Sequence, residues 1–274
     1  MNIQLFLGRF FKYLKWCMRG GYTELHLSRV QYPEVLKGKN IIITGGSDGI
    51  GLAMARKFIA AGANVLITGR NAERLEAAAS VIGSTRLHTL QWDVSDMGNM
   101  NNRLEQAVKK LGGVSSFVNN AAFLSTAPYG SEEFFDRTMV TNVKAVYFLC
   151  GKVAEFMRRE NGVAGGKILN ISSVSSFEAD VHPYFLSKRA VNGITEGFAK
   201  KYAPYNIIVN AIAPGYCDSN FNKVDTAVNA YREEPANKRV VLPEEIAELA
   251  TFLLCDASNG IIGQTILCDG GSLL

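Results

Sequence analysis

The 274-residue chain is 47% hydrophobic and 20% charged with seven prolines, a composition that excludes a disordered, fibrous or disulfide-stapled protein. Lys and Arg exceed Asp and Glu by only 29 to 25, too few for a nucleic-acid-binding surface across the whole molecule. The five widely spaced cysteines form no Cys-x-x-Cys or Cys/His pattern, so we expect free thiols, no metal site and a cytoplasmic protein.

The positive charge lies in residues 1–38, which we predict to be an N-terminal extension with six basic and two acidic side chains. At 100° per residue, residues 2–19 are predicted to form a helix with Arg9, Lys12, Lys15 and Arg19 on one arc and mainly apolar side chains on the other. A basic, aromatic-rich helix is typical of segments that lie peripherally in a membrane interface. The alternative is that its apolar face packs on the following domain or on a neighbouring subunit.

From residue 39 onward, short β-branched runs alternate with longer stretches of helical spacing. Seven runs are predicted to be strands: Asn40–Thr44, Asn64–Thr68, Leu87–Gln91, Ser116–Asn119, Lys167–Ile171, Asn206–Ala211 and Gln264–Leu267. Such alternation is typical of strand-helix-strand units. We therefore predict a single α/β domain over residues 39–274, built on a doubly wound, mainly parallel seven-stranded sheet.

A glycine-rich turn follows the first predicted strand, in the order Thr44-Gly45-Gly46-Ser47-Asp48-Gly49-Ile50-Gly51. A turn between a buried strand and a helix can hold a pyrophosphate against free backbone N–H groups. Gly45 permits the tight turn, Gly49 lets the backbone approach the phosphates, and Gly51 lets helix and strand pack closely. The turn predicts a dinucleotide site.

Further motifs follow in the order found in the classical short-chain dehydrogenase/reductase family, which the chain resembles over residues 39–272. The resemblance implies a Rossmann-type sheet that binds NADP or NAD. It places adenine beside Asp93 and Val94, and the adenosine ribose beside the Asn119-Asn120-Ala121-Ala122 run, where Ala122 replaces the usual Gly. The implied contacts to the cofactor are Gly45, Ser47, Asp48, Gly49, Ile50, Gly51, Asp93, Val94, Asn120, Ala121 and Ala122, with Pro214, Gly215 and Ser219 at the nicotinamide end.

The end of the second strand favours NADP. An acidic side chain there would accept hydrogen bonds from the ribose 2′-hydroxyl of NAD, but the position that is usually acidic in the family is Gly69. Arg70, Asn71 and Arg74 follow, and a guanidinium group can bind the 2′-phosphate of NADP. NAD stays possible, because Asp48 stands where NADP-preferring relatives often have a basic residue.

Tyr184 and Lys188 are four residues apart and share one face of a predicted helix. Reduction of a carbonyl needs a proton donor at its oxygen, and a tyrosine with an ordinary pKa of ~10 needs a nearby cation to stabilise its phenolate. We expect Lys188 to supply that charge and to hold the cofactor ribose. Both side chains are therefore counted as catalytic and as cofactor-binding.

Two further residues complete the catalytic set that the resemblance implies. The fifth predicted strand ends in Ser172-Ser173, and the second serine is the one that polarises the substrate oxygen in the family. Asn142 matches the helix asparagine that holds a water in a proton relay to the lysine. The predicted tetrad is Asn142, Ser173, Tyr184 and Lys188.

These observations predict an oxidoreductase that uses NADP(H), or NAD(H), to interconvert a carbonyl and a secondary alcohol. One alternative is a 3-oxoacyl carrier-protein reductase, and another is an inactive dinucleotide-sensing regulatory or scaffold protein. A homodimer or homotetramer is expected from the resemblance. His182, which precedes the Tyr-Lys motif, is interpreted as a surface or structural residue.

Overall fold

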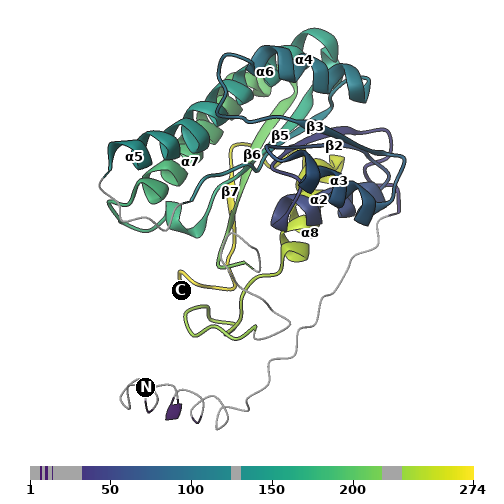
Figure 1. Ribbon diagram of the computed structural model, residues 1–274. Helices are drawn as coiled ribbons and strands as arrows, with labels where there is room; N and C mark the ends of the chain where they lie inside the picture. Colours follow the sequence, from purple (N-terminus) through teal and green to yellow (C-terminus); the bar gives the residue numbers. More distant parts are fainter. Residues whose placement is uncertain (1–6, 8–9, 12–13, 15–32, 125–130, 218–229) are drawn as a thin grey trace.

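The computed structural model describes residues 7, 10–11, 14, 33–124, 131–217 and 230–274. Its strands form one sheet between two layers of helices (Figure 1). They are β1 (Asn40–Thr44), β2 (Asn64–Gly69), β3 (Leu87–Gln91), β4 (Ser116–Asn119), β5 (Gly166–Ile171), β6 (Ile207–Pro214) and β7 (Thr265–Cys268). The order across the seven-stranded sheet is β3-β2-β1-β4-β5-β6-β7, and each neighbouring pair is parallel. The predicted doubly wound α/β fold is confirmed.

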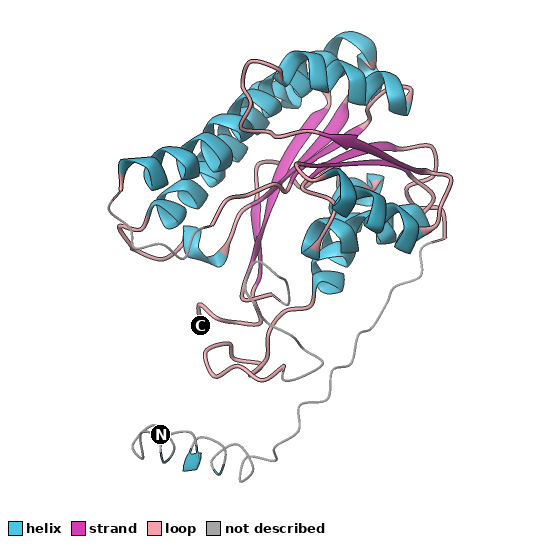
Figure 2. Ribbon diagram, in the orientation of Figure 1, coloured by secondary structure: helices cyan, strands magenta, loops and turns pink. Residues whose placement is uncertain are grey.

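Both faces of the sheet are covered, which explains why the strands are continuous apolar runs rather than alternating ones (Figure 2). Helices α2 (Gly49–Ala60), α3 (Ala72–Ile82) and α8 (Pro243–Leu254) pack on one face. Helices α4 (Met100–Leu111), α6 (Ala145–Glu160) and α7 (Pro183–Tyr202) pack on the other. Successive strand residues serve the two cores in turn: Ile41 and Ile43 face α2 and α8, whereas Ile42 faces α4 and α6.

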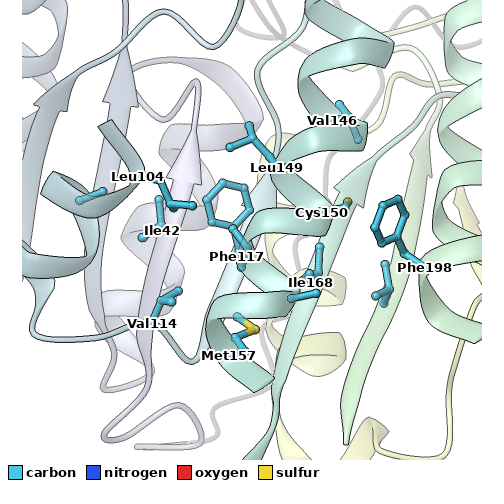
Figure 3. Close-up of a cluster of buried hydrophobic side chains, with 14 of the residues drawn as sticks. Ile42, Leu104, Val114, Phe117, Val146, Leu149, Cys150, Met157, Ile168 and Phe198 are labelled. Atoms are coloured by element: carbon cyan, nitrogen blue, oxygen red, sulfur yellow. The ribbon is translucent and has the colours of Figure 1, made fainter. Parts of the chain in front are cut away.

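Phe117 of β4 lies at the centre of the core on the α4 and α6 side (Figure 3). Leu149 and Met157 of α6 flank its ring, and Leu104 of α4 approaches from the side of β1. Phe117, Leu149 and Met157 are at most 1% exposed. Packing at this density fixes α6 on the sheet and thereby positions the segment that leads into it.

The segment between α5 (Glu132–Met139) and α6 is a π-helical turn, Val140–Lys144. The backbone N–H of Ala145 donates to the carbonyl of Val140, five residues earlier. Turns of this kind are rare and are frequently found at functional sites. The turn contains Asn142, whose side chain it directs into the protein, where the residue is only 1% exposed.

Strand β6 is longer than the predicted Asn206–Ala211 and ends at Pro214. Ala213 and Pro214 extend it because they pair with Leu267 and Cys268 of β7, a partner that lies far away in the sequence. Pro214 is tolerated there because a strand end needs fewer ladder hydrogen bonds.

The proposed boundary at residue 39 stays a prediction. Leu36, three residues earlier, is already fully buried in the core, and its backbone N–H donates to the carbonyl of Ala61 at 2.9 Å. Among the described residues, no helix is both long enough and apolar enough to cross a membrane.

Candidate active site

A cleft of about 1170 Å³ opens at the carboxyl ends of the strands. Strands β1 and β4 are neighbours in the sheet but lead to helices on opposite faces. Ligands of open α/β sheets bind in the crevice that this reversal creates. The turns after β1 to β6 all contribute to its lining.

The glycine turn after β1 is shaped for a close ligand. Gly45 and Gly49 have φ of +66° and +51°, a region that side chains disfavour. A Cβ on Gly51 would collide with the carbonyl oxygen of Gly45 and lie 2.7 Å from Nδ2 of Asn120. All three glycines line the cleft, so the backbone itself forms the cradle.

Asn120 and Thr44 hold this turn to the end of β4. Nδ2 of Asn120 donates to the carbonyls of Thr44 at 3.0 Å and Gly45 at 2.8 Å. Oγ1 of Thr44 accepts from the backbone N–H groups of Asn120 and Ala121 at 3.0 and 3.1 Å. Sequence reasoning missed Thr44, although a hydroxyl at the last position of the strand is the signal that could have found it.

The other expected cofactor residues fall along the same cleft. Lining it are Ser47, Asp48, Ile50, Arg70, Asn71, Arg74, Asp93, Val94, Ala121, Ala122, Pro214 and Gly215. Asn71 caps α3, where its Oδ1 accepts from the backbone N–H of Arg74 at 2.9 Å, which fixes the first turn of the helix beside both arginines. Ser219 lies outside the described residues. The glycine cradle and this lining fit an extended dinucleotide.

Tyr184 and Lys188 project into the cleft from the first turns of α7. Nζ of Lys188 lies 5.5 Å from the centroid of the Tyr184 ring and donates to the carbonyl of Ile171 at 2.8 Å. Lys188 is only 4% exposed, and burial lowers its pKa from 10.5 to about 8. The ammonium still carries its charge at neutral pH.

The pKa of Tyr184 runs against the sequence expectation. Burial raises it to about 12, and the hydrogen bond with Ser173 offsets only part of that rise. The Lys188 ammonium donates its hydrogen bond to the carbonyl of Ile171 and not to the phenol oxygen. Tyr184 therefore holds its proton at neutral pH, which suits a proton donor.

The two serines at the end of β5 have different partners. Oγ of Ser172 donates to Oδ1 of Asn192 at 2.6 Å, a contact that ties the strand to α7. Oγ of Ser173 accepts from the backbone N–H of Ser175 at 3.2 Å, and its hydroxyl is the one that reaches Tyr184. The structure thus brings the second serine to the tyrosine, as the motif predicts.

Asn142 lies behind the cleft rather than in its lining. Its Oδ1 accepts from the backbone N–H of Phe123 at 2.7 Å, and its Nδ2 donates to the carbonyl of Phe123 at 2.9 Å and to Oγ of Ser187 at 3.1 Å. Ser187 in turn donates to the carbonyl of Tyr184 at 2.7 Å. Asn142 therefore joins the chain after β4 to the first turn of α7, and its expected part in a proton relay stays a prediction.

His182 is a structural residue at the start of α7. Its Nδ1 accepts from the backbone N–H of Tyr184 at 3.1 Å, so it caps the helix that carries the tyrosine. Its ring packs edge-on against Phe134 at 5.5 Å and against Phe185 at 6.1 Å. Pro183 at the first helical position is the signal from which this cap could have been predicted.

The substrate end of the cleft has an aromatic wall. Phe123, Leu124, Phe185 and Tyr216 line the cleft there, together with Glu178. The apolar side chains of Phe123 and Leu124 follow directly after the Asn119-Asn120-Ala121-Ala122 run. Phe185 and Tyr216 were not expected in this wall, because an aromatic residue in a helix or loop is usually interpreted as core.

Comparisons with known proteins agree with this geometry. A family model described as enoyl-(acyl carrier protein) reductase matches residues 45–272. The chain is 32% identical over 255 residues to dehydrogenase/reductase SDR family member 4 of Sus scrofa, covering 89% of this chain and 90% of that protein. It is 36% identical over 252 residues to 2-dehydro-3-deoxy-D-gluconate 5-dehydrogenase of Dickeya dadantii, covering 87% and 96%. The solved structure of 3-ketoacyl-(acyl-carrier-protein) reductase from Brucella melitensis complexed with NADH superimposes with a TM-score of 0.78 and 29% identity, covering 87% and 100%.

Proposed function

Because the chain belongs to the short-chain dehydrogenase/reductase family and is an oxidoreductase that interconverts CH–OH and C=O groups with NAD(P), we propose that it transfers hydride between NADP(H) and a small carbonyl or secondary alcohol, with Tyr184 as the acid and base. The observation that carries this proposal is the meeting of Ser173, Tyr184 and Lys188 in the cleft that the glycine turn opens. The neighbouring glycine cradle provides the place for a nucleotide.

Bound NADPH supplies the hydride to the carbonyl carbon. The hydroxyls of Ser173 and Tyr184 would both hydrogen-bond the substrate oxygen and hold it for attack. Tyr184, protonated because burial keeps its pKa at about 12, would donate its proton to that oxygen as negative charge develops there. The Lys188 ammonium, 5.5 Å from the ring, would stabilise the phenolate that remains and also hold the cofactor ribose. Oxidation of an alcohol would use the same groups in reverse.

Asn142 would act through other residues. Its three hydrogen bonds to Phe123 and Ser187 fix the position of the aromatic wall relative to the first turn of α7. We assign it this positioning role beside the proton relay that the family motif implies. Neither role requires its amide to touch the substrate.

NADP is the cofactor that the arginines favour. Arg70 and Arg74 both line the adenosine end of the cleft, and Gly69 offers no carboxylate to a ribose 2′-hydroxyl. A 2′-phosphate would therefore find two cations here, opposed by the carboxylates of Glu73 and Asp48, which line the same cleft. The test is the ratio of kcat/KM for NADPH to that for NADH. The ratio should exceed one and should fall in Arg70→Ala. A preference for NADH that Arg70→Ala leaves unchanged contradicts the assignment.

A 3-oxoacyl carrier-protein reductase is the second candidate. The Brucella melitensis structure supports it, and an open aromatic wall accommodates an acyl chain. Rapid reduction of an acetoacetyl thioester, compared with small sugars and ketones, would favour this candidate.

The experiment that tests the general proposal is a substrate panel followed by nicotinamide absorbance. The purified protein should oxidise NADPH with at least one carbonyl class in the panel. Inactivity with every substrate, combined with tight cofactor binding, would favour the dinucleotide sensor instead. A sensor without chemistry has no need of Lys188, whose pKa is lowered to about 8 by burial.

We propose a homodimer or homotetramer in the cytoplasm. Tyr147 and Phe148 on α6 are 51% and 44% exposed, and a second copy would bury this aromatic surface. Cys150, Cys255 and Cys268 are free thiols, which suits a reducing compartment. Light scattering of the purified protein would give the number of subunits.

A further inference from the structure

The N-terminal extension carries an apolar stripe that faces solvent. Leu7, Phe10, Phe11 and Leu14 are helical and are 45%, 48%, 62% and 41% exposed. Their spacing of three, four and seven residues places them on one helix face. The rings of Phe10 and Phe11 meet edge-on at 6.1 Å, which makes the middle of the stripe a continuous aromatic surface.

Positive charge accompanies this stripe in the sequence. Arg9, Lys12, Lys15 and Arg19 lie outside the described residues, and at 100° per residue their sequence positions fall on the arc opposite the stripe, which they share with Leu5 and Trp16. Residues 1–38 have six basic and two acidic side chains, so their net charge equals the +4 of the whole chain. The remaining residues are therefore neutral overall. The neutral domain has no net negative charge to attract these basic side chains, whereas anionic lipid headgroups do.

A lipid surface also matches the chemistry of the apolar side. Aromatic side chains are favoured at the boundary between headgroups and acyl chains. A spanning helix needs ~20 predominantly apolar residues, and the recurring basic residues leave no such run here. Fourteen residues separate Gly21 from Leu36, which is buried in the core. This length of chain lets the domain stand clear of a surface that the helix occupies.

We propose that the N-terminal helix docks the protein on anionic membranes. The stripe of Leu7, Phe10, Phe11 and Leu14 enters the headgroup boundary, and the basic arc pairs with lipid phosphates. The catalytic cleft takes no part in this contact. Docking therefore places the reaction beside the membrane without changing its chemistry.

Vesicle flotation of the purified full-length protein tests this proposal. Wild type should float with vesicles of phosphatidylcholine mixed with phosphatidylglycerol, and high salt should weaken that binding. The Phe10→Ser/Phe11→Ser double variant should lose at least about tenfold in partitioning. Lys12→Gln/Lys15→Gln, which keeps Arg9 and Arg19, should lose at least about tenfold in partitioning to the anionic vesicles.

A matched control removes two exposed apolar side chains from the catalytic domain. Val81 on α3 and Phe252 on α8 are 64% and 39% exposed, and Val81→Ser/Phe252→Ser should float like wild type. Cofactor binding should be equal in all of these proteins, which shows that each is folded. Wild type that stays in solution with anionic vesicles overturns the proposal, as does equal flotation of Phe10→Ser/Phe11→Ser. A lower subunit number in that variant by light scattering would instead assign the stripe to a contact between copies.

Discussion

Replacing Lys188 by Met should abolish turnover and yet stabilise the folded protein at neutral pH. Lys188 is 4% exposed, and burial lowers its pKa from 10.5 in the unfolded chain to about 8 in the folded one. At ~1.4 kcal/mol per pKa unit, holding the ammonium inside costs about 3 kcal/mol at neutral pH. Met fills a similar volume without charge, but it leaves the carbonyl of Ile171 without its 2.8 Å hydrogen bond. That loss costs about 1 kcal/mol.

The net gain of about 2 kcal/mol should raise Tm by about 5 °C, and it should depend on pH. Because the folded pKa lies below the unfolded one, the unfolded chain binds more protons between pH 8 and 10.5. Wild-type stability therefore rises with pH across this window, and the cost of the charge is gone above it. The advantage of Met should shrink accordingly.

Urea unfolding followed by tryptophan fluorescence measures both effects, at neutral pH and near pH 10.5. Lys188→Arg is the matched control, because it keeps its charge at either pH and should be less stable than wild type at both. A Lys188→Met protein that is less stable than wild type at neutral pH would refute the reasoning. So would an equal gain at both pH values.

Variants at three further positions test the cofactor cradle and the parts around the tyrosine. Gly51→Ala should weaken NADPH binding at least about tenfold in a fluorescence titration, because its Cβ meets the Gly45 carbonyl; unchanged binding would show that the cradle is not used. His182→Ala should lose about 1 kcal/mol in thermal unfolding and lower kcat more than it changes KM, because Tyr184 loses its helix cap. His182→Asn, which can still cap, should restore both quantities, and failure of that rescue argues against the cap. Asn142→Ala should cost about 2–4 kcal/mol in urea unfolding, because it leaves a backbone N–H and a carbonyl unpaired; a loss below about 0.5 kcal/mol would contradict its positioning role.

The fold was largely predictable because its signals are local. The run Ile41-Ile42-Ile43 is β-branched and fully buried, and a glycine turn follows it at Gly45. The exception is β6, whose last two residues are strand only because β7 pairs with them. Parallel pairing joins residues far apart in sequence, and no local pattern encodes it.

The candidate site likewise has features that local sequence predicts and features that depend on tertiary structure. The glycine turn and the spacing of Tyr184 and Lys188 are visible in the sequence because turn geometry and helix periodicity are local. The rise in the pKa of Tyr184 was not foreseeable, since it depends on how deeply the fold buries the ring and on where the Lys188 ammonium finds a carbonyl. The hydrogen bonds of Asn142 depend likewise on a π-helical turn that helical periodicity does not reveal.

The central claim is that Tyr184 is the proton donor, and the Tyr184→Phe variant tests it most directly. The measurement is kcat for carbonyl reduction with NADPH, with the dissociation constant of NADPH determined on the same protein. Phe keeps the ring but removes the hydroxyl, so kcat should fall by about 10²–10⁴-fold while the dissociation constant stays as in wild type. A Tyr184→Phe enzyme that turns over at the wild-type rate would contradict the account.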